Sequence, residues 1–249
     1  MEYEFLASVY DEFMEDTPYE KWRDIIVSAL KERGITEGIV LDMGCGTGKM
    51  TRLLKEVGFD MIGVDNSVEM LRVAYDNTNP DDEILYLNQD MTEFELYGTV
   101  RAVVSICDCV NYVTNPDDLL ECFKLVNNYL DPDGVFIFDF NTEYKYKEVI
   151  GDSVIAENRE NASFIWENYY DEAPELNEYD VTLFIKDEES DMYVKNTETH
   201  VQRGYTLNQM RQIIEDSGLI FEKAFDEETL AEPTAESERI FVIAREKGK

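Results

Sequence analysis

The chain has 249 residues, 44% of them hydrophobic, so it is long and apolar enough to bury a sizeable core and is not disordered. Its 55 acidic and 22 basic side chains give a net charge of −33, which disfavours a nucleic-acid substrate because binding a polyanion depends on Lys and Arg. The acidic N-terminus lacks a signal-peptide pattern and no apolar run is long enough to span a membrane, so we expect a cytoplasmic protein. The four cysteines are too few for a disulfide framework, and we expect neither disulfides nor a metal.

The most informative stretch is residues 39–50, which read IVLDMGCGTGKM. Apolar residues 39–41 predict a buried parallel strand that ends at Asp42, and the apolar spacing after the turn predicts a helix. Three glycines at alternate positions form the turn: Gly44, Gly46 and Gly48. They allow a sharp turn and let backbone N–H groups approach a ligand closely. The G-x-G-x-G spacing differs from the dinucleotide fingerprint, which disfavours an NAD-linked oxidoreductase.

Residues 40–54, VLDMGCGTGKMTRLL, resemble the first motif of class I S-adenosylmethionine-dependent methyltransferases. The resemblance implies a doubly wound, Rossmann-like α/β fold with a seven-stranded sheet, and S-adenosyl-L-methionine as the cofactor. It also implies that Asp42 and the three glycines bind the methionine part of that cofactor. A glycine-rich turn that binds no ligand is the structural alternative.

The segment before this motif, residues 1–38, is rich in aromatic side chains. Residues 19–31 predict an amphipathic helix. One interpretation is a flap over the sheet edge. The other is a helical lid over the cofactor, because YDEFM and PYEKW resemble small bacterial members of the family. In the lid, Tyr10 would contact the cofactor and Trp22 the methyl acceptor.

Acidic residues close or follow the next two expected strands. Asp65 ends the strand within residues 61–67, about twenty residues past the glycine loop, where a carboxylate can accept hydrogen bonds from both ribose hydroxyls. Asn66 adjoins it in the expected cofactor site. By resemblance, Asp90 binds the adenine amine and the backbone of Met91 a ring nitrogen. An exposed loop aspartate is the alternative reading of Asp90.

Residues 102–107 predict a fourth strand whose end opens onto the ligand cleft of an open α/β sheet. Cys107 would lie beside the cofactor, and Asp108 and Tyr112 are candidate catalytic residues. The D/N-P-P-Y motif of many amino-group methyltransferases is absent here, which disfavours a DNA-type or protein-glutamine-type enzyme. Next come a helix from residue 117 with the start signal Asn115-Pro116-Asp117, a tight turn at 130–134 and a fifth strand.

Residues 145–202 then change to the alternating pattern of four β-strands, at 154–155, 163–170, 178–186 and 192–202. We interpret them as an inserted antiparallel sheet that forms a roof over the substrate end of the cleft. A last helix with Thr206 as its N-cap and two antiparallel edge strands complete the core. The expected division is a lid at 1–38, a methyltransferase core at 39–144 and 203–249, and a β insertion at 145–202.

His200 is the one histidine in the sequence, and it can act as a general base because its pKa lies near neutrality. A hydrogen-bonded sheet residue is the alternative. Strand alternation places His200 and Arg203 on opposite faces. Arg203 could hold a substrate carboxylate, with Tyr205 beside it.

These features together predict methyl transfer to a nitrogen or oxygen of a small-molecule acceptor, by a monomer or homodimer. An RNA or protein methyltransferase, or a non-catalytic module that binds S-adenosylmethionine or a partner protein, are the alternatives.

Overall fold

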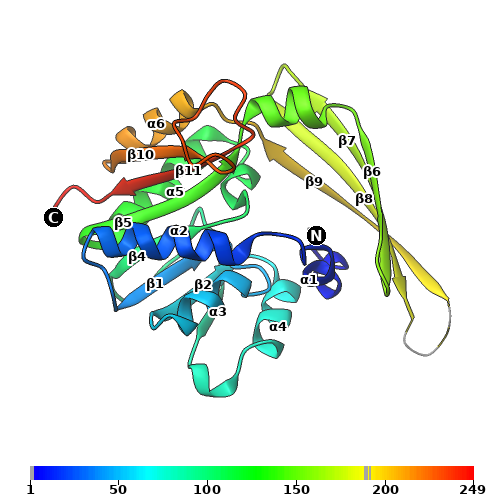
Figure 1. Ribbon diagram of the computed structural model, residues 1–249, viewed down its shortest axis with the longest axis horizontal. Helices are drawn as coiled ribbons and strands as arrows, with labels where there is room; N and C mark the ends of the chain where they lie inside the picture. Colours follow the sequence, from blue (N-terminus) through cyan, green and yellow to red (C-terminus); the bar gives the residue numbers. More distant parts are fainter. Residues whose placement is uncertain (1–2, 188–189, 191) are drawn as a thin grey trace.

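The computed structural model describes residues 3–187, 190 and 192–249 as a core built on one sheet, with a second sheet standing apart from it (Figure 1). The core sheet has seven strands in the order β10-β11-β5-β4-β1-β2-β3. Only β11 runs antiparallel to its neighbours, so the doubly wound fold is confirmed. The strands are β1 (Ile39–Met43), β2 (Asp60–Asp65), β3 (Leu85–Asn88), β4 (Val100–Ser105), β5 (Leu130–Asn141), β10 (Ile220–Asp226) and β11 (Arg239–Arg245).

Helices cover both faces of this sheet. One face packs against α2 (Tyr19–Glu32) and α3 (Lys49–Glu56), and the other against α5 (Pro116–Tyr129) and α6 (Leu207–Asp216). α4 (Val68–Asp76) packs beside β2 and β3. The local start signals act as expected: Asn115 caps α5, and Thr206 forms a capping box with Gln209 at α6.

The turn expected at residues 130–134 is instead part of β5. Leu130 pairs with Val100 and Val135 with Ala102, so four residues of β5 bulge outward opposite a single residue of β4. The strand therefore begins earlier than its apolar run, because the bulge accommodates the polar residues without ending the pairing.

The second sheet is antiparallel, with its strands in sequence order: β6 (Val154–Asn158), β7 (Ala162–Asp171), β8 (Leu176–Lys186) and β9 (Tyr193–Arg203). The N-terminal η1 (Leu6–Ser8) and α1 (Tyr10–Phe13) lie between this sheet and the core (Figure 1). Val9 packs against the buried Tyr179 and Leu183 of β8, and the rings of Phe13 and Phe164 meet at 4.8 Å. Within the described residues, no helix is both long and apolar enough to cross a bilayer.

Candidate active site

The candidate site lies where the order of strands reverses. β1 pairs with β2 on one side and with β4 on the other, and loops at the carboxyl ends of these strands surround a cavity of about 300 Å³. This is the position at which open α/β sheets bind their ligands, and the volume suits a small molecule.

The glycine loop forms one wall of the cavity. The N–H groups of Gly44 and Cys45 both donate to the Val64 carbonyl, at 2.8 and 3.0 Å, which ties the loop to β2. A Cβ on Gly46 would meet no atom within 4 Å, so the missing side chain leaves open space at the wall. Gly48, in contrast, does not line the cavity. It precedes α3 at φ +74°, where a Cβ would lie 2.5 Å from the Tyr86 hydroxyl, so packing explains this glycine.

Two acids lie at this wall. Asp42 is buried and accepts a hydrogen bond from Thr51 Oγ1 at 2.5 Å, and burial raises its pKa to about 7. Asp65 accepts the N–H groups of Gly46 at 2.8 Å and Ser67 at 2.9 Å, one on each oxygen. Ser67 also caps α4 with its side chain, so the Asp65 carboxylate lies beside the start of this helix and already has protein contacts. Each oxygen still keeps acceptor capacity for a ligand.

The loop after β3 brings further polar groups to the cavity. Asp90 and Met91 line it, together with Gln89 and Asn66. Asp90 Oδ1 accepts hydrogen bonds from the backbone N–H and the hydroxyl of Thr92, at 2.8 and 2.6 Å. These bonds fix the carboxylate beside the cavity.

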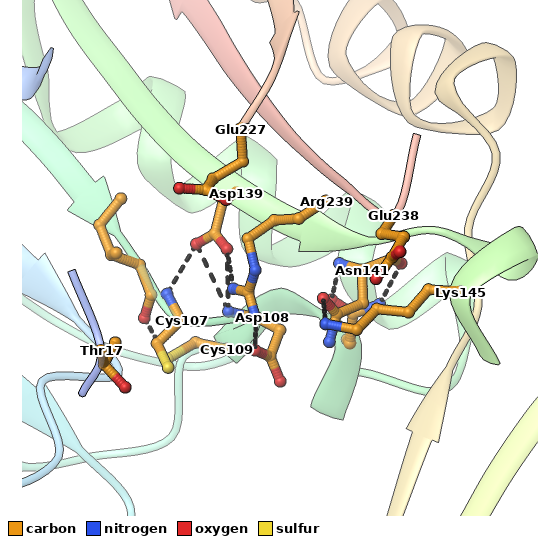
Figure 2. A network of polar contacts seen from close by, with 12 residues as sticks. Thr17, Cys107, Asp108, Cys109, Asp139, Asn141, Lys145, Glu227, Glu238 and Arg239 are labelled. Atoms are coloured by element: carbon orange, nitrogen blue, oxygen red, sulfur yellow. Dashed lines mark hydrogen bonds and ion pairs between the residues drawn. The ribbon is translucent and has the colours of Figure 1, made fainter. Parts of the chain in front are cut away.

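The loop after β4 forms the opposite wall and is strained. Cys107 and Asp108 have φ of 71° and 52°, a left-handed conformation that costs non-glycine residues free energy. Figure 2 shows what holds them: Asp139 accepts the Cys107 N–H at 2.6 Å and also binds Arg239. Arg239 in turn binds Asp108 at 2.6 Å. Asp108 is therefore engaged in an ion cluster with Arg239 and Asp139 and does not line the cavity, whereas Cys107 does.

Tyrosines close the remaining side. Tyr10 and Tyr112, both expected at the site, line the cavity together with Tyr3 and Tyr19, which were not expected. Burial raises the pKa of all four well above the usual tyrosine value, so their hydroxyls are neutral. Burial likewise raises the pKa of the Cys107 thiol to about 12, which leaves Tyr10 Oη facing a neutral sulfur at 3.9 Å. The aromatic richness of residues 1–38 was the signal for Tyr3 and Tyr19.

Other expected substrate residues lie elsewhere. Trp22 is buried against Phe241 in the core beneath α2, and its Nε1 donates to Glu227 at 3.0 Å. Tyr205 is buried and donates to the Val113 carbonyl. Neither lines the cavity, because packing and hydrogen bonding hold both side chains in the core.

Arg203 and His200 also lie outside the cavity lining. Arg203 forms an ion pair with Glu175 at 2.6 Å and so is already neutralised. The register of β9 with β8 is continuous, so His200 and Arg203 face opposite sides of the sheet. His200 is completely buried, with Tyr112 between it and the cavity.

The described residues of 145–202 contribute nothing to the cavity lining. Their sheet meets the site indirectly, through contacts of Tyr179 and His200 with Tyr112 and Tyr3. Additional lining residues that the sequence did not reveal are Thr47, Lys49, Met50, Val64, Met70, Thr92, Ile106, Cys109, Val113, Thr114, Asn115 and Asp118. They come from several loops, and only the fold brings them together.

Comparison with known proteins assigns the chain to a family. Residues 40–134 match the model of a methyltransferase domain. YqeM of Bacillus subtilis (strain 168), named as a candidate methyltransferase, is 36% identical over 248 residues, covering 98% of this chain and 97% of the relative. The chain belongs to the class I S-adenosylmethionine-dependent methyltransferases.

Two further proteins similar to this methyltransferase also carry methyltransferase names. The crystal structure of an S-adenosylmethionine-dependent methyltransferase from Clostridium acetobutylicum ATCC 824 is 27% identical, covers 98% of each chain and superposes with a TM-score of 0.88. A glycine/sarcosine N-methyltransferase of Halorhodospira halochloris is 29% identical over 151 residues, 52% of this chain and 54% of its own.

The methyltransferase uses S-adenosyl-L-methionine, and the cavity walls fit that group. The open space at Gly46 lets the backbone approach a ligand, and Asp65 presents paired acceptors at the end of β2. Neutral aromatic rings opposite can face a positively charged sulfur.

Proposed function

We propose that the enzyme transfers the methyl group to a nitrogen or oxygen of a small molecule, and that an amine is the preferred acceptor. The observation that carries this proposal is the composition of the cavity wall. This wall has four aspartates, and Lys49 is the one basic residue among the described lining residues. Such a wall favours a cation over an anion. The aspartates are Asp42, Asp65 and Asp90, which we assign to the cofactor half below, and Asp118 of α5, which remains for the acceptor.

The whole chain supports the same choice. Its net charge of −33 repels RNA, and the relative named a glycine/sarcosine N-methyltransferase acts on small amines by its name. A protein acceptor is less well supported, because the cavity encloses only about 300 Å³.

In the cofactor half of the site, we assign the ribose to Asp65 and the adenine to Asp90 with the Met91 backbone. Gly44 and Gly46 provide the wall for the methionine part, with Asp42 beneath the loop. Asn66, Cys107 and Tyr10 complete this half as contact residues.

S-adenosylmethionine supplies an activated methyl group, so the chain's residues mainly orient the acceptor and exclude water. Tyr112 and the N-terminal tyrosines form the wall opposite the glycine loop. Their neutral hydroxyls can position an acceptor nitrogen without competing as nucleophiles.

We also propose that the N-terminal segment acts as a lid and that the β insertion supports it. Glu198 of β9 accepts the N–H groups of Tyr3 at 3.1 Å and Leu6 at 3.0 Å. On the core side, Asp11 accepts the hydroxyl of Thr47, a residue of the glycine loop, at 2.6 Å. The segment is thus fastened to both neighbours while it covers the cavity.

Calorimetry with S-adenosylmethionine and S-adenosylhomocysteine tests the cofactor half. Loss of two charge-assisted acceptors in Asp65→Ala should weaken binding roughly 10- to 100-fold, while the exposed Asp76→Ala should bind as wild type does. Equal affinity in Asp65→Ala would remove that residue from the site.

Labelled S-adenosylmethionine with a panel of acceptors tests the reaction. The panel pairs small amines with the corresponding alcohols and adds transfer RNA and denatured protein. Transfer to an amine supports the proposal. Transfer only to RNA or protein would replace it, and tight cofactor binding without transfer to any acceptor would indicate a binding module.

A further inference from the structure

A continuous chain of hydroxyl groups leads from the cavity to the buried histidine. The Tyr3 and Tyr112 hydroxyls, both from residues that line the cavity, lie 2.5 Å apart. Tyr112 Oη lies 2.6 Å from Tyr179 Oη and 3.4 Å from His200 Nδ1. The route begins in the N-terminal segment, passes through η3 (Cys109–Tyr112) after β4 and ends on β9.

The surroundings of His200 are suited to holding a proton. The imidazole is fully buried and stacks on Tyr179, with ring centroids 5.0 Å apart and an interplanar angle of 11°. The edge of Tyr3 faces it at 4.8 Å. The Glu198 carboxylate lies 3.3 Å from Nε2, on the side away from Tyr112. In the described structure, the titratable groups facing His200 are therefore Glu198, Tyr3, Tyr112 and Tyr179, and one carboxylate would balance an imidazolium.

Resting on the proposed methyl transfer to an amine, we propose that Tyr3 and Tyr112 relay the acceptor's proton to His200 Nδ1. An acceptor ammonium gives one proton to Tyr3 Oη, Tyr3 passes its own proton to Tyr112, and Tyr112 passes its proton to His200. With S-adenosylmethionine bound, the freed nitrogen lone pair would form the bond to the methyl carbon, and the electron pair of the broken carbon–sulfur bond would stay on the sulfur. The proton remains on His200, beside Glu198, until it is released to solvent.

The tyrosines suit a relay better than they suit the role of base. Each hydroxyl can donate and accept at the same time, and burial keeps both in the neutral form that does so. Among the side chains of this route, only His200 offers a basic ring nitrogen that can accept the proton.

Glu198 is a positioning residue in this arrangement. The same carboxylate that faces Nε2 accepts the backbone N–H groups of Tyr3, Phe5 and Leu6. Closure of the N-terminal segment therefore places Tyr3 beside Tyr112 and completes the route, whereas an open segment interrupts it.

Because the sequence has a single histidine, nuclear magnetic resonance can observe the end of the route directly. Protein labelled with ¹⁵N-histidine and saturated with S-adenosylhomocysteine should show a neutral imidazole protonated on Nε2, with Nδ1 as an acceptor. Tyr112→Phe should shift the Nδ1 resonance by several ppm, and Tyr3→Phe less. The exposed Tyr97→Phe should leave it unchanged. A proton on Nδ1 of the neutral ring, or no shift in Tyr112→Phe, would overturn the relay.

Kinetics with an amine from the acceptor panel gives the second readout. Tyr112→Phe and His200→Gln should each lower kcat 10²- to 10⁴-fold and abolish the acidic limb of the pH–rate profile. Affinity for S-adenosylhomocysteine should change less than twofold, which also shows that the variants fold. Wild-type kcat in either variant contradicts the relay. If no amine is methylated, the proposed function fails, while the histidine resonances still decide whether Nδ1 can accept a proton.

Discussion

At the scale of single residues, burial controls the protonation of the site. Asp42 is buried beneath the glycine loop, and burial raises its pKa to about 7. Asp65 is shifted in the same direction, but two backbone N–H groups favour its ionised form and oppose the shift. The two acids of the cofactor wall therefore differ in how readily each ionises.

The raised pKa of Asp42 makes stability depend on pH. The unfolded chain releases this proton near pH 4, whereas the folded protein retains it to about pH 7. The stabilisation that folded Asp42 gains from holding this proton is therefore fully present below about pH 4 and is lost as pH rises through about pH 7. Asp42→Asn, which keeps an acceptor for Thr51, removes this dependence.

As pH rises from about 4 to 7, we expect the free energy of unfolding of Asp42→Asn to increase relative to wild type by up to about 1.4 kcal/mol per pH unit. Urea unfolding at pH 5, 6, 7 and 8 measures the difference, in which the other titrating groups cancel. The exposed Asp76→Asn serves as the control and should follow wild type. A constant difference between wild type and Asp42→Asn would contradict a raised pKa.

At the scale of elements, the sequence predicted what local signals specify. Strand and helix order, the caps at Asn115 and Thr206 and the four strands of the insertion all follow from patterns within a few residues. Contacts between segments that lie far apart in the sequence could not be predicted in this way. Arg239 reaches Asp139 across 100 positions, and Tyr3 reaches Glu198 across 195. Trp22 looked suited to a ligand because nothing local identifies its partner, Glu227.

The N-terminal segment is the element whose behaviour the structure makes testable. Hydrogen bonds to an ionised group contribute about 1.5–3 kcal/mol each. Glu198→Gln removes the charge that binds the segment, so amide hydrogen exchange across residues 3–16 should become roughly 10- to 100-fold faster. Exchange in β1 should be unaffected.

Glu178→Gln provides the matched control for this lid, since Glu178 lies exposed on the neighbouring strand β8. It should leave exchange in the segment unchanged. Slow exchange in Glu198→Gln would mean that apolar packing on β8, and not the carboxylate, holds the segment closed.

At the scale of the whole molecule, a strongly acidic chain uses its few cations to join distant parts. The partly buried Arg239 of β11 binds Asp139 of β5 and Asp108 after β4 (Figure 2). Asp108 also accepts a hydrogen bond from Gln202 of the insertion at 2.7 Å. One guanidinium thus connects the sheet, the strained wall of the cavity and the inserted sheet.

We therefore expect Arg239→Met to lower the free energy of unfolding of the whole protein, and not only to disturb the candidate site. It leaves the carboxylates of Asp139 and Asp108 close together, with the first fully buried, and loss of one partner from a buried ion pair costs about 3–5 kcal/mol. Urea unfolding measures this loss.

Arg72→Met is the control: its exposed pair with Glu69 at 3.1 Å should contribute less than about 1 kcal/mol. Arg239→Lys keeps the charge but cannot bridge both carboxylates in the same way, so its stability should fall between wild type and Arg239→Met. A loss in Arg239→Met no larger than in Arg72→Met would show that the two aspartates are stable without the guanidinium.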